Sequence, residues 1–270
     1  MRGSPVNAFE YLKKTGLEGK VVIVTGGARG IGLGIVKRFC AEGCRVIIAD
    51  IKTSAGGAVA EELQHAGCLV TFMELDVTDE AAANSMADAV VELYGRIDIL
   101  VNNAGITADG RSVTVDKETG EVTVMSYERW SQVLHVNLDG AFICSQAVLR
   151  HMLPLQSGCV LFMSSVVAVH GGYGQVNYVT SKKALIGLAE TYTIEHGPAG
   201  IRVCVVSPGY TGTEMVLTVP EKVLDKIRAR TPMRRLATIE EIANGIVWLA
   251  GDQASFVNGI VLRIDGGLKP

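Results

Sequence analysis

Short apolar runs alternate with longer amphipathic segments along most of the chain. Runs rich in valine, isoleucine and leucine cover residues 20–27, 45–50, 69–77, 97–105, 158–165, 201–209 and 259–267. Continuous β-branched runs of this length are typical of parallel strands that are covered on both faces. The segments between them carry apolar residues with the period of a helix. The pattern predicts an α/β fold: a doubly wound, mostly parallel seven-stranded sheet with helices on both faces.

No linker-like tract divides this alternation, so we expect one domain over residues 17–270 after an N-terminal extension, residues 1–16. Residues 112–124, SVTVDKETGEVTV, break the rhythm, because apolar and polar residues alternate there on either side of a turn sequence. This predicts an inserted β-hairpin. The hairpin is either a solvated surface insertion or an element that contacts the substrate or another subunit.

Composition narrows the class of protein. Hydrophobic residues make up 48% of the 270 residues and charged residues 20%, which suits a compact core. Since the net charge of -3 is spread along the chain, we expect no nucleic-acid or membrane partner. The chain start lacks the apolar core of a signal peptide, and no uncharged apolar run approaches the ~20 residues that span a bilayer. We therefore expect a cytoplasmic protein.

The six cysteines form no CxxC pair and no cluster with histidine. Several lie in apolar runs, as in SGCVLFM and IRVCVVSP. We expect buried free thiols in a reducing compartment, and no metal site.

A glycine-rich turn, TGGARGIG, follows the first predicted strand and opens the first predicted helix. Gly26, Gly30 and Gly32 leave room for a tight turn, and their backbone N–H groups can approach a pyrophosphate. The N-terminus of the helix adds partial positive charge. In this place the turn predicts a dinucleotide site.

Asp50 ends the second predicted strand. A carboxylate there accepts hydrogen bonds from the ribose hydroxyls of the adenosine and repels a 2′-phosphate, which favours NAD over NADP. Arg29 and Lys52 are close enough in sequence to offer a phosphate a partner instead. Asp50 has a second reading, as the N-cap of the next helix.

Tyr178 and Lys182 stand four positions apart in NYVTSKKAL. On a helix such residues share one face. A free phenol has a pKa of ~10 and is a poor base near neutral pH. A lysine ammonium one turn away favours the phenolate and lowers that pKa.

The chain resembles the short-chain dehydrogenase/reductase family over about residues 17–268. The motifs that carry the resemblance are TGGARGIG, LDV with Asp76, NNAG at 102–105, HVNLDG with Asn137, MSSVVA with Ser165, YVTSK, SPGYTGT at 207–213 and FVNGIVLRIDGG. Their order and spacing are specific to the family, and Ser165 precedes Tyr178 by the expected 13 positions. The most similar members are 3-oxoacyl-carrier-protein reductases and NAD-dependent secondary-alcohol and polyol dehydrogenases.

The resemblance implies a role for each of four catalytic residues. Tyr178 exchanges a proton with the substrate oxygen, and Ser165 hydrogen-bonds the same oxygen. Lys182 holds the nicotinamide ribose and tunes Tyr178. Asn137 links Lys182 to solvent through a water. The alternatives are purely structural roles: Ser165 caps a strand end, and Asn137 bonds a backbone carbonyl inside a helix.

The resemblance also implies the coenzyme contacts. They are Gly26, Arg29, Gly30, Ile31, Gly32, Asp50, Asp76, Val77, Asn103, Tyr178, Lys182, Thr211 and Thr213. Asn103 also ties neighbouring strands, and either threonine alternatively just opens the next helix. Residues 211–232 correspond to the variable substrate lid of the family.

We therefore expect an oxidoreductase that transfers a hydride between NAD(H) and a secondary alcohol or ketone. One alternative is an NADP-dependent 3-oxoacyl-thioester reductase. Another is a non-catalytic dinucleotide-binding regulator. The resemblance implies a small-molecule substrate and a homo-tetramer, with a dimer as the alternative.

Overall fold

The computed structural model describes residues 15–217 and 220–268. Seven parallel strands form one sheet in the order β3-β2-β1-β4-β7-β8-β9, which confirms the predicted fold class. Their bounds are Val21–Thr25 (β1), Arg45–Asp50 (β2), Leu69–Glu74 (β3), Ile99–Asn102 (β4), Gly158–Met163 (β7), Ile201–Pro208 (β8) and Val261–Ile264 (β9). Strand order reverses beside β1, where β4 pairs with it after the crossover from β3. Ligands bind at such switch points in open α/β sheets.

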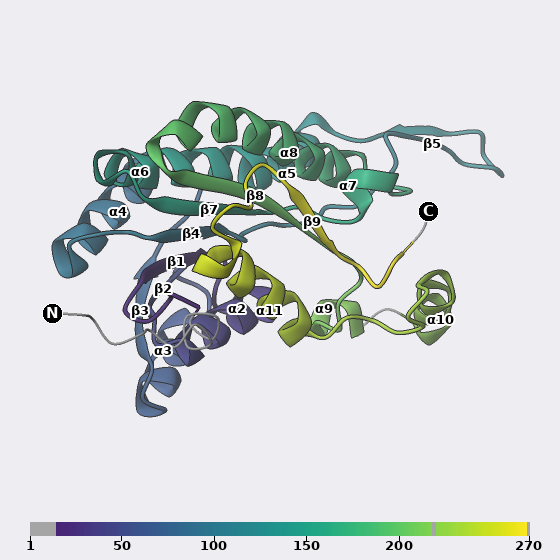
Figure 1. Cartoon of the computed structure of the whole chain (residues 1–270). Helices are drawn as coiled ribbons and strands as arrows, with labels where there is room; N and C mark the ends of the chain where they lie inside the picture. The colour runs from purple at the N-terminus through teal and green to yellow at the C-terminus, as the bar shows by residue number, and fades with distance from the viewer. Residues whose placement is uncertain (1–14, 218–219, 269–270) are drawn as a thin grey trace, which may run out of the picture.

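Helices cover both faces of the sheet (Figure 1). Their bounds are Gly30–Ala41 (α2), Gly56–His65 (α3), Glu80–Tyr94 (α4), Tyr127–Leu134 (α5), Gly140–Leu155 (α6), Val167–His170 (α7), Val176–His196 (α8), Glu214–Leu217 (α9), Glu221–Arg230 (α10) and Ile239–Ala250 (α11). Helices α2, α3 and α11 pack on one face, and α4, α6 and α8 pack on the other.

Each face of the sheet has its own hydrophobic core. Side chains alternate along β1, so that Val22 and Val24 join the core beneath α2 and α11 while Val21 and Ile23 join the core beneath α4 and α6. Because both faces are covered, all five residues of β1 are buried. This double burial is the reason that the strands read as continuous apolar runs in the sequence.

The long helical pattern after residue 126 is not one regular helix. A five-residue π-helix, His135–Asp139, separates α5 from α6. Extra residues of this kind inside helices are frequent at functional sites. Asn137 lies within this irregular turn.

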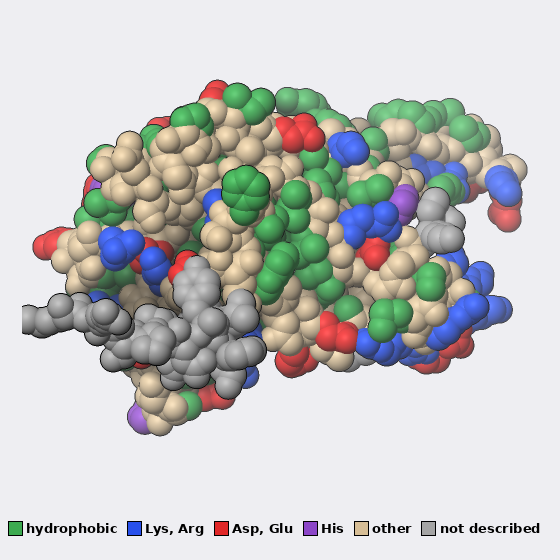
Figure 2. Space-filling model, in the orientation of Figure 1, with side chains coloured by type: hydrophobic (Ala, Val, Ile, Leu, Met, Phe, Trp, Pro, Cys, Tyr) green, Lys and Arg blue, Asp and Glu red, His purple; other side chains and the backbone are tan. Residues whose placement is uncertain are grey.

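Residues 112–124 form a separate two-stranded ribbon. Strand β5 (Val113–Val115) pairs antiparallel with β6 (Val122–Val124) and joins no strand of the main sheet. The ribbon projects from the body beyond α5 (Figure 1), and apolar side chains line its outer side (Figure 2). Its four valines are between 52% and 65% exposed.

All six cysteines are free thiols, and four of them are buried. Burial raises the pKa of the Cys159 thiol to about 12, so this side chain is chemically inert at neutral pH. Among residues 15–217 and 220–268, no helix is long and apolar enough to cross a bilayer. Most of the expected N-terminal extension, residues 1–14, lies outside the described residues.

Candidate active site

A cavity of about 310 Å³ opens at the carboxyl ends of the central strands. Seven of the predicted site residues line it: Ile31, Asn103, Ser165, Tyr178, Lys182, Thr211 and Thr213. They come from α2, from α8 and from the segments that follow β4, β7 and β8. The parallel sheet therefore gathers at one edge residues that are nearly two hundred positions apart in the sequence.

Tyr178 and Ser165 form a hydrogen-bonded pair at the cavity. Tyr178 lies in the first turn of α8, and Ser165 follows β7 after one intervening residue. Burial raises the pKa of the Tyr178 phenol, and the hydrogen bond with Ser165 acts in the opposite direction. In this structure the phenol therefore holds its proton at neutral pH. The lowered pKa expected from the sequence requires the positive charges of Lys182 and of a bound oxidised nicotinamide to outweigh this burial.

Lys182 is a buried cation one helical turn beyond Tyr178. Its Nζ donates to the backbone carbonyl of Met163 at 2.8 Å and lies 5.8 Å from the centre of the Tyr178 ring. Burial lowers the pKa of Lys182 to about 8. Most Lys182 side chains therefore remain charged at pH 7, but the proton is easier to remove than in a solvated lysine.

Asn137 lies behind the cavity wall and is fully occupied by hydrogen bonds. Its Oδ1 accepts from the Ile106 N–H at 2.8 Å, and its Nδ2 donates to the Ile106 carbonyl and to Ser181 Oγ. A Cβ built on Gly105 would lie 3.1 Å from both Asn137 Oδ1 and Lys182 Nζ. Gly105 thus leaves the space in which these two polar groups approach each other.

The glycine-rich turn fits a dinucleotide. Gly26 has φ +64°, and a Cβ there would lie 2.9 Å from Ala104 Cα. A Cβ on Gly32 would lie 2.0 Å from the Gly26 carbonyl oxygen, so neither position tolerates a side chain. The N-cap of α2, Arg29, is exposed and makes no capping hydrogen bond, and the first turn carries no acidic residue. The first backbone N–H groups of α2 are therefore suited to a phosphate.

Two side chains fix the shape of this turn. Asn103 Nδ2 donates to the carbonyls of Thr25 and Gly26, both at 3.0 Å. Asp50 Oδ2 accepts from the Ala28 N–H at 3.0 Å. The alternative reading of Asp50 as a helix N-cap is wrong, because α3 begins at Gly56 with Ala55 as its N-cap.

Asp76 and Val77 lie outside the cavity wall. Hydrogen bonds from the hydroxyl and the N–H of Thr78 lower the pKa of the exposed Asp76 carboxyl. Val77 is 8% exposed and packs against Gly140 at the start of α6. The structure thus gives both residues a local packing role, and their contact with an adenine ring remains a prediction.

The segment after β8 closes the cavity from the other side. Thr211 is buried and donates to the Gly209 carbonyl at 3.2 Å. Thr213 accepts from the Val216 N–H at the start of α9, so it opens this short helix as well as facing the cavity. The predicted lid consists of α9 and α10, and its residues 218–219 lie outside the described residues.

Sequence reasoning missed several cavity residues. They include Thr107, Gln175 and Tyr210, whereas Val216 lies in the predicted lid. Thr107 and Tyr210 lie in segments that follow a strand, and this position was the available signal. No group of three or more metal-ligating side chains occurs among the described residues.

Known proteins share this sequence pattern over almost the whole chain. The family model described as enoyl-(acyl carrier protein) reductase matches residues 26–269. The 3-oxoacyl-[acyl-carrier-protein] reductase FabG of Thermotoga maritima is 39% identical over 93% of this chain and 98% of its own. The meso-2,3-butanediol dehydrogenase of Serratia marcescens is 34% identical over 93% of this chain and 94% of its own.

A solved structure agrees with these relatives. The crystal structure of gox2181 has a TM-score of 0.87 and 33% identity, and the match covers 95% of this chain and 98% of that one. The chain belongs to the short-chain dehydrogenase/reductase family and is an oxidoreductase.

Proposed function

We propose that the protein is an NAD-dependent dehydrogenase that interconverts a secondary alcohol and a ketone. The observation that carries this proposal is the hydrogen-bonded pair of Ser165 and Tyr178 beside the buried Lys182, at the wall of one cavity. Two hydroxyl groups there can reach a single substrate oxygen, and a cation stands within one helical turn.

The chain's residues bind, orient and move a proton. The α2 N-terminus with its glycine turn holds the pyrophosphate, and Asp50 receives the adenosine ribose. When bound, the nicotinamide accepts or supplies the hydride. Ser165 orients the substrate oxygen by a hydrogen bond. Tyr178 donates its proton to a ketone oxygen or removes the proton of an alcohol.

Proton supply involves three side chains. In the reducing direction Tyr178 carries the proton to be donated, and the hydrogen bond with Ser165 opposes the burial that raises its pKa. In the oxidising direction the charge of Lys182 stabilises the phenolate. Asn137 keeps the turn next to Lys182 in place, and we propose that a water held there relays the proton to solvent.

Coenzyme preference follows from Asp50. Its carboxylate accepts from the N–H of Ala28 in the glycine turn, where a 2′-phosphate would meet negative charge. We expect Asp50→Ser to lower the preference for NAD over NADP at least 10-fold in kcat/KM, because a tenfold change corresponds to only about 1.4 kcal/mol. Parallel kinetics with both coenzymes measure the ratio. An unchanged ratio would assign the selection to Arg29 or to the loop backbone.

A second function has support from two observations. The relatives include 3-oxoacyl-[acyl-carrier-protein] reductases, and basic side chains gather around α10 (Figure 2). These are Lys222, Lys226, Arg228, Arg230, Arg234 and Arg235. Arg228 and Arg235 already pair with acidic neighbours, whereas the others offer charge to an acidic partner. An NADP-dependent 3-oxoacyl-thioester reductase is therefore the competing assignment.

One assay separates these functions. It follows the absorbance of reduced nicotinamide with cyclic, polyol and 3-hydroxyacyl alcohols, each with NAD and with NADP. Turnover of a simple alcohol with NAD supports the first proposal. Turnover restricted to NADP and 3-hydroxyacyl thioesters replaces it with the second. Binding of coenzyme without any turnover across the panel indicates a dinucleotide-binding regulator.

We also propose a homo-tetramer. Trp248 on α11 is 40% exposed and Phe256, in the segment leading to β9, is fully exposed, which leaves apolar surface near the sheet edge. Such surface is typical of subunit contacts. Native mass spectrometry measures the assembly, and a monomeric mass would reject the proposal.

A further inference from the structure

Ser165 lies two residues before a very short helix. Helix α7 has only four residues, Val167–His170, and ends at Gly171 with φ +82°. Its first turn holds Ser165 directly: the Val167 N–H lies 3.4 Å from Ser165 Oγ, and the Ala168 N–H donates to the Ser165 carbonyl at 3.0 Å. The backbone on either side of Ser165 is bound to β8, because the Ser164 and Val166 N–H groups donate to the Val206 and Pro208 carbonyls. Helix α7 adds the contacts to the hydroxyl and the carbonyl of Ser165 itself.

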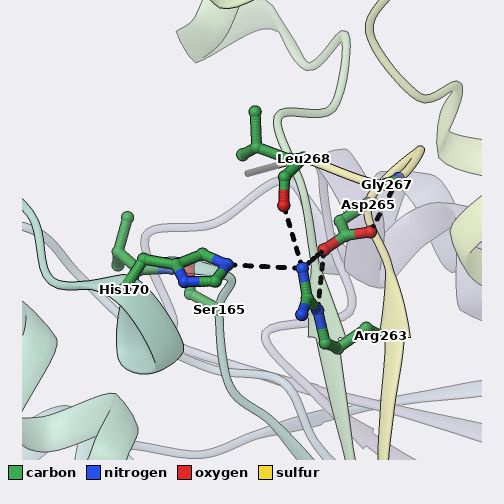
Figure 3. Close-up of polar contacts among 7 residues, drawn as sticks. Ser165, His170, Arg263, Asp265, Gly267 and Leu268 are labelled. Atoms are coloured by element: carbon green, nitrogen blue, oxygen red, sulfur yellow. Dashed lines mark hydrogen bonds and ion pairs between the residues drawn. The ribbon is translucent and has the colours of Figure 1, made fainter. Parts of the chain in front are cut away.

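The far end of α7 is attached to a distant part of the chain. His170 Nε2 lies 3.3 Å from Arg263 Nη2, at the end of β9 (Figure 3). A guanidinium only donates, so His170 accepts this hydrogen bond with a neutral ring that carries its proton on Nδ1. The contact bridges 93 positions of sequence.

Arg263 is itself held by three hydrogen bonds to two groups. Its Nε and Nη2 both donate to Asp265 Oδ2, at 2.8 and 2.5 Å, and its Nη2 also donates to the Leu268 carbonyl at 2.9 Å. His170, at 3.3 Å, is the most distant of the three acceptors around Nη2. Asp265 is buried and accepts from the Gly267 N–H with its other oxygen. Figure 3 shows the guanidinium between the end of α7 and the C-terminal turn. Arg263 is exposed, but these hydrogen bonds give His170 a positioned partner.

The same turn supports the opposite wall of the cavity. The Gly209 N–H donates to the Ile264 carbonyl at 2.9 Å, and a Cβ on Gly209 would lie 2.8 Å from Asp265 Cα. Gly209 lines the cavity. Arg263 therefore adds a side-chain link between the serine-bearing segment and the segment after β8, which the Val166 N–H and the Pro208 carbonyl already join.

We propose that His170 and Arg263 are positioning residues for the reaction. Their hydrogen bond keeps α7 wound and thereby holds the Ser165 hydroxyl, which α7 contacts through the Val167 N–H, in the direction that a substrate oxygen requires. Neither side chain lines the cavity. The inference rests on the proposed function, because it assigns these residues a role through Ser165.

The test uses His170→Leu, which removes the acceptor, and His170→Gln, whose amide oxygen can replace it. Since small displacements of a catalytic group can cost up to ~100-fold in rate, we expect His170→Leu to lower kcat about 10-fold with an unchanged coenzyme Kd. His170→Gln should recover most of this loss. The matched control is His65→Leu on α3, an exposed histidine far from the cavity, which should leave kcat unchanged.

A second background distinguishes positioning from general destabilisation. Once Ser165→Ala has removed the hydroxyl, His170→Leu should lower kcat by less than about twofold, because two changes that act through one group are not additive. A full 10-fold loss in that background, or no loss of kcat in the native background, would overturn the proposal.

Hydrogen exchange tests the tether without any turnover. The Gly171 N–H donates to the Val167 carbonyl at 2.8 Å, so its exchange reports whether the end of α7 is wound. We expect peptides over residues 164–172 to exchange faster in His170→Leu but not in His170→Gln or His65→Leu. Equal exchange in all four proteins would reject the tether. If the wild type turned over no alcohol, the proposed function would fail while this measurement still decided on the tether.

Discussion

Helix α8 buries a lysine, whereas the ribbon of β5 and β6 exposes four valines. Lys182 is 4% exposed, and Val124 is 65% exposed. Each region reverses the usual distribution of polar and apolar residues. The reversal at α8 is supported by hydrogen bonds that link Lys182, Ser164 and Met163 within the cavity wall. The ribbon pairs with no strand of the main sheet and its valines are more than half exposed, so they contribute little to the stability of the fold.

The comparison of α8 with the ribbon shows that the burial of a residue does not by itself identify its function. Around α8 the buried polar groups are almost all paired, as expected for groups that the fold cannot leave unsatisfied. In the ribbon the valines face one side and Thr114 and Thr123 face the other, since directly paired residues share a face. The paired polar groups around α8 hold the side chains of the candidate active site in place. The valines of the ribbon form an exposed apolar surface.

The largest effect on turnover is expected for Tyr178→Phe. Removal of the hydroxyl should lower kcat at least 100-fold, because general acid–base groups contribute about 10²–10⁴-fold. The fold and the coenzyme affinity should persist, because the ring still packs in α8. Steady-state kinetics, circular dichroism and coenzyme titration measure the three quantities. Retention of more than about a tenth of the rate would contradict the assigned role.

Lys182→Met tests the cost of the buried cation. The pKa of Lys182 is 10.5 in an unfolded chain and about 8 in the fold, so the fold disfavours its charge by about 3 kcal/mol. At pH 7 we expect the variant to be as stable as the wild type or more stable, while losing turnover. Denaturant unfolding at pH 7 checks the first statement, and a large loss of stability would show that the hydrogen bond to Met163 dominates.

The same variant predicts a pH dependence. Between pH 8 and 10.5 the unfolded Lys182 binds more protons than the folded one, so this group makes the free energy of unfolding rise with pH. The stability difference between Lys182→Met and the wild type should therefore shrink over this interval. Comparing the two proteins cancels the opposite contribution of the buried cysteines. A constant difference would contradict the lowered pKa.

The smallest effect concerns the exposed valines. Replacing Val113, Val115, Val122 and Val124 together by threonine should change the free energy of unfolding by less than about 0.5 kcal/mol per site, because these side chains are already solvated. The matched control is Val160→Thr in β7. It should cost about 1–3 kcal/mol, since its hydroxyl would be buried without a partner. Equal losses at both places would mean that the ribbon is covered in solution.

The strands of the sheet and many residues of the cavity could be predicted from the sequence, because short local motifs mark them. Runs such as VVIVT in β1 show that a strand is buried on both faces, and TGGARGIG shows where a strand meets a helix. The π-helix around Asn137 was not predicted, because its extra residue leaves no trace in the apolar period. Gln175 was missed because a single glutamine before a helix carries no signal of its own.

The sequence by itself determined the alternation of strands and helices, the glycine turn and the spacing of Tyr178 and Lys182. These are properties of neighbouring residues. Only the tertiary structure decided that Asp50 bonds the glycine turn instead of capping a helix, and that burial raises the Tyr178 pKa. It also joined His170 to Arg263. Such facts depend on contacts between distant segments, because desolvation and hydrogen bonding are set by whichever groups the fold brings together.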